Sequence, residues 1–147
     1  MEEKSGWSVL EKIRPKVRNF YGEGDWSLLG ENVVRLAIVG SRHMSEYGRR
    51  VVEKIMPVLV EKGVVIVSGF MYGVDITVHK SCVEMGGKTV AVLGWGLMTE
   101  GRHKWIVDNG GLVISEWKNE EAQPWMFASR NRIVAGISKA VLVVEAA

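Results

Sequence analysis

The stretch LAIVGSR, residues 36–42, decides the fold class, because a buried strand runs directly into polar residues. Apolar residues lead into Gly40, Ser41 and Arg42. A glycine lets a ligand approach the backbone, and N–H groups and a hydroxyl at a helix start attract anions. An arginine adds a fork of donors that matches phosphate. The stretch predicts a strand that ends in a phosphate-binding turn; an ordinary strand-to-helix turn with a surface arginine is the alternative.

Five short runs of this apolar kind punctuate the chain. They are rich in Val and Ile, continuous rather than alternating, and lie at residues 35–39, 64–67, 89–93, 112–114 and 140–144. Such runs are typical of parallel strands that helices bury on both faces. The intervals between them leave room for crossover helices. We therefore predict an α/β fold: a doubly wound, mostly parallel, Rossmann-like sheet with helices on both faces.

The crossover helices are expected where apolar residues recur at helical spacing. We place them at residues 46–62, 75–85 and 104–109, with a fourth that starts near Ser129. Pro57 should kink the first of them, because proline removes a backbone hydrogen bond.

The first 34 residues are less regular. Residues 20–25, FYGEGD, are predicted to be a turn-rich approach to the first strand. We therefore divide the chain into a lead-in segment, 1–34, and a core domain, 35–147.

Composition excludes several classes of protein. The 147 residues suit one domain, and a net charge of +2 means that any basic patch must be local. Cys82 is the only cysteine, so the chain has no internal disulfide, and we expect no metal site and no cofactor. The N-terminus lacks a signal sequence and no run is long enough to span a membrane, so we expect a cytoplasmic protein that makes no membrane contact.

A second glycine-rich turn follows the second predicted strand. It contains Ser68, Gly69, Gly73 and Asp75, and it matches neither a dinucleotide fingerprint nor a Walker loop. Asp75 and His79 lie one helical turn apart and could form a catalytic pair. A helix cap next to a hydrogen-bonded histidine is the favoured alternative.

Two arginines, Arg130 and Arg132, are expected in the first turn of the fourth helix. Cations there oppose the helix dipole, and a bound anion would convert that repulsion into attraction. The alternative is that they pair with Glu116 or Glu145.

The remaining loops at the same end of the sheet carry aromatic and basic residues. Trp95, Trp117 and Trp125 could stack on unpaired bases, or form a lid or a dimer contact. The run 102–104, Arg-His-Lys, could meet a phosphate backbone or lie in a solvated loop.

Taken together, five motifs resemble, in order and spacing, the DNA-processing protein A family, also called Smf. They are AIVGSR, VVIVSGFMYGVDITVH, GGKTVAVLGWGL, GLVISE and FASRNRIVAGISKAVLVVEA, and the likeness covers residues 13–147. The resemblance implies a Rossmann-like domain that binds single-stranded DNA during natural transformation (competence) and DNA recombination. It also implies a binding protein rather than an enzyme, which forms a homodimer and helps to load the RecA recombinase.

The resemblance further implies which residues contact DNA. They are Gly40, Ser41, Arg42, Ser68, Gly69, Gly73 and Asp75, together with Arg130, Asn131 and Arg132, which match the family's RNR motif. Met71 and Tyr72 replace the small and basic residues that the family usually carries in the second turn. We also expect the family's last helix and strand to be missing from this sequence.

Two other functions stay open. One is a small-nucleotide-binding or nucleotide-cleaving protein on the same fold, with residues 94–97 as its loop and Glu116 as its carboxylate. The other is a subunit that works only when paired, because the last predicted strand would leave an exposed sheet edge.

Overall fold

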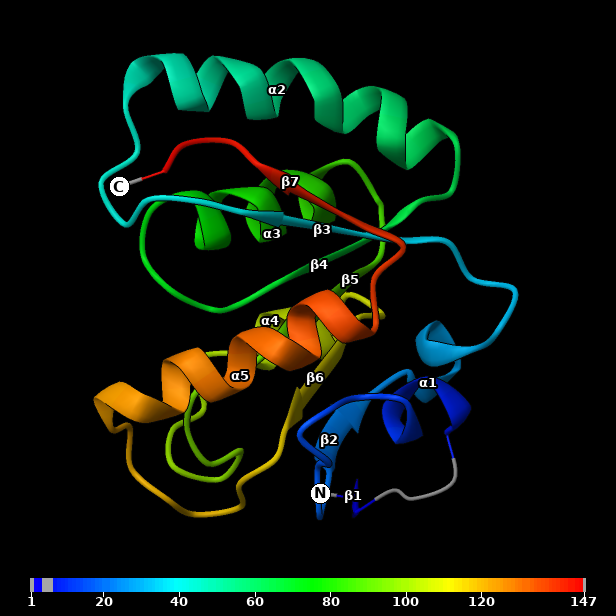
Figure 1. Cartoon of the computed structure of the whole chain (residues 1–147). Helices are drawn as coiled ribbons and strands as arrows, with labels where there is room; N and C mark the ends of the chain where they lie inside the picture. Colours follow the sequence, from blue (N-terminus) through cyan, green and yellow to red (C-terminus); the bar gives the residue numbers. More distant parts are fainter. Residues whose placement is uncertain (1, 4–6, 147) are drawn as a thin grey trace.

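A computed structural model describes residues 2–3 and 7–146, and its centre is a seven-stranded sheet (Figure 1). The strands are β1 (Glu2–Glu3), β2 (Tyr21–Gly24), β3 (Arg35–Val39), β4 (Val65–Ser68), β5 (Thr89–Val92), β6 (Leu112–Ser115) and β7 (Ala140–Val143). They lie in the order β1-β2-β6-β5-β4-β3-β7. The strands from β3 to β7 pair in parallel, whereas β1 and β2 add an antiparallel edge. The predicted fold class and its five core strands are confirmed.

Helices cover both faces of this sheet (Figure 1). They are α1 (Ser8–Glu11), α2 (Glu46–Glu61), α3 (Val74–Glu84), α4 (Lys104–Asp108) and α5 (Pro124–Gly136), with a 3₁₀ turn at Trp26–Leu29. Successive strand residues point to opposite faces. Val65 and Val67 pack in the cluster that includes α1 and α5, whereas Ile66 packs against α2 and α3. Continuous apolar strands are therefore needed, because both faces are buried.

The order of the strands places the candidate site. The chain moves from β3 through β4 and β5 to β6, and then α5 returns it so that β7 pairs with the other side of β3. The loops that follow these parallel strands therefore lie side by side along the carboxyl ends of the strands. We call this end of the sheet the carboxyl edge. In open α/β sheets, ligands bind at this edge, next to the point where the strand order reverses.

The fourth crossover helix starts earlier than predicted. α5 begins at Pro124 rather than near Ser129, because proline fits the first turn of a helix, where its missing N–H costs nothing. Arg130 and Arg132 therefore lie in the middle of the helix. The argument that they oppose the helix dipole in its first turn is wrong.

The lead-in contributes a strand that the sequence interpretation missed. Tyr21–Gly24 forms β2, which pairs antiparallel with β6 and aligns Tyr21 with Ser115. Gly22, which was interpreted as part of a turn, instead makes room for the Trp26 ring. A Cβ on Gly22 would lie 2.5 Å from that ring.

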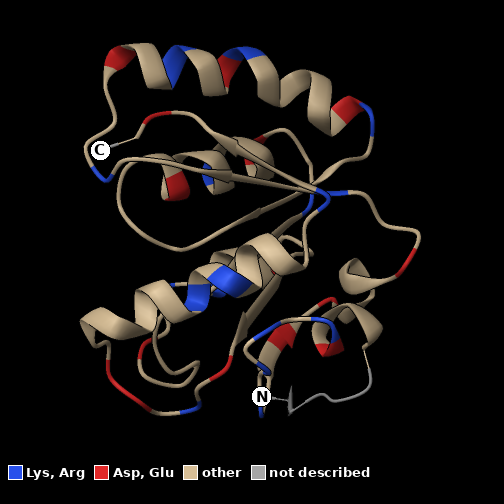
Figure 2. Ribbon diagram, in the orientation of Figure 1, with Lys and Arg blue, Asp and Glu red and all other residues tan. Residues whose placement is uncertain are grey.

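The described residues contain no helix with the length and apolar character needed to cross a bilayer. Charges of both signs alternate along the outer surface of α2, whereas α5 carries basic but no acidic residues (Figure 2). The charged residues of α5 are thus Arg130 and Arg132.

Candidate functional site

The loops after β3 and β4 are joined to each other. The backbone N–H of Val74 donates to the Ser41 carbonyl at 3.1 Å. Gly73 has φ +80°, and a Cβ there would collide with the same carbonyl oxygen. Glycine is needed at this position both for its backbone conformation and for the close approach. Gly73 thus sets the position of the β3 loop relative to α3.

Gly69 lies directly against two charged side chains. A Cβ on this residue would be 2.5 Å from Arg130 Nη1 and 2.6 Å from Asp75 Oδ2. The backbone at the end of β4 therefore packs on both groups. The structure brings three predicted site residues together here, although they come from three separate elements.

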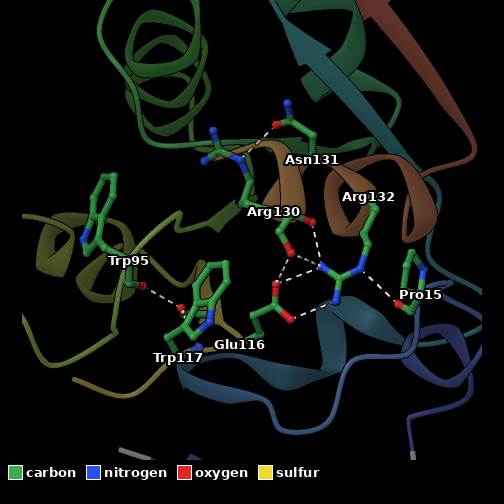
Figure 3. Close-up of polar contacts among 9 residues, drawn as sticks. Pro15, Trp95, Glu116, Trp117, Arg130, Asn131 and Arg132 are labelled. Carbon is green, nitrogen blue, oxygen red and sulfur yellow. Dashed lines mark hydrogen bonds and ion pairs between the residues drawn. The ribbon is translucent and has the colours of Figure 1, made fainter. Parts of the chain in front are cut away.

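Arg130 is buried, and its guanidinium is held on two sides. Nη1 donates to the Val92 carbonyl at 2.8 Å. Nε donates to Asn131 Oδ1 at 3.0 Å, as Figure 3 shows. Burial lowers the pKa of Arg130, although the charge of Asp75 acts in the opposite direction. Burial raises the pKa of Asp75, and the positive charge of Arg130 opposes that rise. The two groups thus compensate each other inside the protein.

Arg42 provides an exposed cation above this buried pair. Its Cζ lies 5.5 Å from the centre of the Phe127 ring, and Arg130 Cζ lies 5.9 Å from the same ring. Arg42 also lowers the pKa of Arg130, as expected for two cations in one field. Asp75 can neutralise only one of them. The site therefore carries excess positive charge, which is accessible through Arg42.

An aromatic pocket of about 240 Å³ adjoins these cations. Its walls include Phe70, Tyr72, Trp95 and Phe127, and the Trp95 and Phe127 rings meet edge to face with centroids 6.3 Å apart. Phe127 thus contributes both to the pocket and to the cation site. The sequence analysis did not assign it a role, although its position three residues before Arg130 puts the two on one helix face.

His79 is fully buried and uses both ring nitrogens. Nε2 lies 2.6 Å from the Gly69 carbonyl, and Nδ1 lies 2.6 Å from Thr89 Oγ1. Burial lowers its pKa to about 4, so the ring is neutral at pH 7. Because a carbonyl only accepts, the neutral ring carries its proton on Nε2, and Nδ1 is an acceptor. The single hydroxyl hydrogen of Thr89 is shared between Nδ1 and the Ile66 carbonyl, which lies 3.1 Å from the hydroxyl oxygen. The hydrogen-bonded histidine is confirmed. The expected cap is not, because Asp75 makes no capping hydrogen bond in the first turn of α3.

The turn after β3 differs from the predicted phosphate cradle. α2 begins three residues beyond His43, and its N-cap residue is Ser45. The Glu145 carboxylate accepts hydrogen bonds from the Ser45 backbone, at 2.8 Å, and from its hydroxyl. The Glu145 carbonyl also accepts from the Ser41 N–H at 2.7 Å. These backbone donors are satisfied within the chain, and the Arg42 side chain faces solvent.

The close approach of Glu145 also explains Gly40. A Cβ at Gly40 would lie 2.9 Å from the Glu145 carbonyl oxygen and 2.8 Å from a Val74 methyl. The glycine accommodates a contact within the protein. Ser68 is likewise fully buried, beneath the site, and its hydroxyl acts to lower the pKa of Asp75.

The structure separates Arg132 from Arg130. Arg132 forms a two-pronged ion pair with Glu116, with both N–O distances 2.8 Å, and its Nε donates to the Pro15 carbonyl at 2.9 Å. The two arginines leave α5 in different directions (Figure 3). Pairing with Glu116 is therefore confirmed for Arg132 and is wrong for Arg130. Asn131 is exposed next to the site and accepts from Arg130.

Comparison with known proteins agrees with this architecture. The family model of DNA recombination-mediator protein A matches residues 3–147. The chain is 38% identical to the DNA processing protein DprA of Streptococcus pneumoniae, covering 95% of this chain and 50% of that protein. It is 36% identical to the Smf protein of Synechocystis, covering 90% of this chain and 35% of that protein. The chain thus spans between about a third and a half of these relatives.

Solved structures show the same fold. The crystal structure of S. pneumoniae DprA superimposes with a TM-score of 0.79 at 35% identity, covering 92% of this chain and 49% of that one. A DprA structure from Helicobacter pylori, which describes a single-stranded DNA binding mode, superimposes with a TM-score of 0.85 at 25% identity, covering 97% of this chain and 67% of that one. This chain belongs to the DNA recombination-mediator protein A family, with the DprA and Smf proteins as its relatives.

Proposed function

We propose that this chain is a single-stranded DNA-binding module that acts in DNA uptake and recombination. The observation that carries the proposal is the pair of cations, Arg42 and Arg130, around the Phe127 ring, which also lines an aromatic pocket. An exposed guanidinium binds a phosphate, and an aromatic surface binds an unpaired base. The single-stranded DNA binding of the H. pylori relative supports the same assignment.

The proposed site distinguishes single strands from duplex. A base can enter the pocket beside Trp95 and Phe127 only when it is neither paired nor stacked on its neighbours. Every base has an aromatic face, so binding is expected to tolerate any sequence. Arg42 supplies the contact that depends on salt.

We also propose that the module acts without catalysis. Glu116, the carboxylate of the nucleotide-cleaving alternative, is neutralised by Arg132 and accepts a further hydrogen bond from the Ser129 hydroxyl at 3.0 Å. His79 is neutral and buried, and Asp75 is buried against Arg130. None of these groups resembles an exposed general acid or base.

The proposed partners follow from the family. We propose that two copies associate and that the module helps to load the RecA recombinase in the cytoplasm, as the family resemblance implies. The exposed edge strand β7 supports association, because Val141, Leu142 and Val143 are 47%, 37% and 55% exposed. Light scattering across a range of concentrations tests the first of these proposals, and strand exchange by RecA tests the second.

A fluorescence anisotropy titration tests DNA binding. We expect single-stranded oligonucleotides to bind, duplex of the same sequence to bind more weakly, and affinity to fall between about 50 and 200 mM salt. Absence of single-strand binding at both salt concentrations, or tighter binding of duplex, would show that the proposed function is wrong.

A further inference from the structure

A second pocket lies further along the carboxyl edge, and we propose that it binds the continuation of the same DNA strand. This inference rests on the proposed function. The pocket has a volume of about 320 Å³ and lies where the carboxyl end of β6 meets the start of β2. Lys16, Arg18, Tyr21, Trp117 and Lys118 contribute to its walls. It therefore combines cations and aromatic rings, the two features that single-strand binding needs.

The charge of this second pocket favours an anion. Lys16, Arg18 and Lys118 are exposed at its wall. Glu116 also lines the pocket, but its two-pronged pair with Arg132 neutralises it. Lys16 and Lys118 alone thus outnumber the remaining carboxylate of the lining, Glu120. Phosphate is the anion that a DNA strand would bring to this position.

Arg132 organises the second pocket rather than the first. Its Nη groups hold Glu116, and its Nε holds the carbonyl of Pro15, the residue before Lys16 (Figure 3). These bonds fix the lead-in against α5 and β6. Arg132 is therefore a positioning residue for Lys16. This role explains why Arg132 does not face the first site, although it belongs to the same RNR motif as Arg130.

A continuous wall connects the two pockets. The loop after β5 donates backbone hydrogen bonds to the loop after β6, from Leu97 to the Trp117 carbonyl at 3.0 Å and from Met98 to the Lys118 carbonyl at 2.8 Å. The Ser115 hydroxyl donates to the Trp95 carbonyl at 2.6 Å. The aromatic walls of the first and second pockets are thus held in one rigid arrangement.

The distance between the pockets suits a strand of several nucleotides. The first site lies at the end of β4 and the second at the start of β2, three strand spacings away, or about 14 Å at 4.8 Å per spacing. Trp117 meets Trp125 edge to face with ring centroids 5.9 Å apart, and Trp125 is 63% exposed. These rings offer a stacking surface next to the second pocket.

The test compares two double variants on strands of two lengths. Lys16→Gln/Lys118→Gln removes two cations of the second pocket, and Lys54→Gln/Lys62→Gln removes two exposed lysines from α2 and its C-terminal end as the matched control. The probes are fluorescent oligothymidines of about 2 nucleotides, which are too short to reach both pockets, and about 16 nucleotides, at the upper end of common single-strand site sizes. Thermal unfolding verifies that each variant is folded, which is expected because all four lysines are exposed.

We expect the Lys16/Lys118 variant to bind the long strand about tenfold more weakly, with a salt slope lower by about 1.4, or 0.7 for each lost phosphate contact. It should bind the short strand within about twofold of the unmodified protein, as should the control on both strands. Unchanged affinity for the long strand, or an equal loss of affinity for both strands, would show that the second pocket does not bind the continuation of the DNA strand.

The outcomes separate this inference from the proposed function. If the unmodified protein binds neither oligothymidine, both the proposed function and the inference that the second pocket binds DNA are wrong. If it binds both lengths and loses affinity on Arg42→Ala, but the Lys16/Lys118 variant behaves like the control, only the second pocket is wrong.

Discussion

Replacement of Arg42 by alanine is expected to weaken single-stranded DNA binding by about 10- to 100-fold. This side chain is exposed and lies over the Phe127 ring, where it can donate to a phosphate while a base enters the pocket beside it. A hydrogen bond to a charged group contributes about 1.5–3 kcal/mol, and 1.4 kcal/mol corresponds to tenfold in affinity. Anisotropy titration of a labelled single strand measures the change.

A matched control separates this site from general electrostatics. Arg50→Ala removes the same charge from the exposed surface of α2 and should change affinity by less than about twofold. Arg42→Lys keeps the charge but loses the planar fork of donors, so an intermediate affinity is expected. Equal affinities of Arg42→Ala and Arg50→Ala for single-stranded DNA would show that Arg42 does not belong to the binding site.

Replacement of Arg130 by methionine is expected to lower the free energy of unfolding by about 3–5 kcal/mol, because it leaves a buried carboxylate without its compensating charge. The carboxylate is Asp75, which packs with Arg130 against Gly69. Chemical denaturation at pH 7 measures the loss. Arg102→Met breaks an exposed pair with Glu100 and should cost less than about 1 kcal/mol.

The role of Asp75 makes this loss dependent on pH. Burial already raises the pKa of Asp75, and removal of Arg130 raises it further. The ionised carboxylate then destabilises the fold fully above its raised pKa. The penalty shrinks as pH falls through the raised pKa, and it is gone below the ordinary pKa of an aspartate. The deficit of Arg130→Met should therefore shrink on acidification. The double variant Arg130→Met/Asp75→Asn should recover most of the loss at pH 7; a double variant no more stable than Arg130→Met would contradict the pairing.

Most of the fold could be predicted from local sequence. Continuous apolar runs such as 89–93 identify the parallel strands, and they match β3 to β7 closely. Burial on both faces holds for β4 to β6 but is wrong for β7, whose four residues are exposed. The strand β2 was missed and the start of α5 was misplaced, because their signals are ambiguous in isolation. The two glycines of β2 resemble a turn until the ring of Trp26 is seen to pack on Gly22. Proline ends many helices, but Pro124 starts α5. Because the start of α5 was predicted too late in the sequence, Arg130 and Arg132 were expected in its first turn rather than in its middle.

The candidate site was harder to predict, because it depends on contacts between distant residues. Gly40 and Ser41 have the local character of a phosphate-binding turn. Glu145, more than a hundred residues later, accepts from the Ser41 N–H and from the first turn of α2. Pairing of Arg132 with Glu116 was one of the alternatives that the sequence left open, but nothing near Arg132 in the sequence indicates that it also holds Pro15. The one local signal that was available and not used is the spacing of Phe127 and Arg130.

The central claim is that a single DNA strand binds at the carboxyl edge of the sheet, with a base beside Phe127. Photo-crosslinking of an iodouracil-substituted single strand, followed by mass spectrometry of the labelled peptides, tests it most directly. The account predicts crosslinks on Trp95, Phe127 or Tyr72, which line the first pocket, and their loss in Arg42→Ala. Crosslinks confined to the outer surface of α2 or to the β7 edge would contradict it.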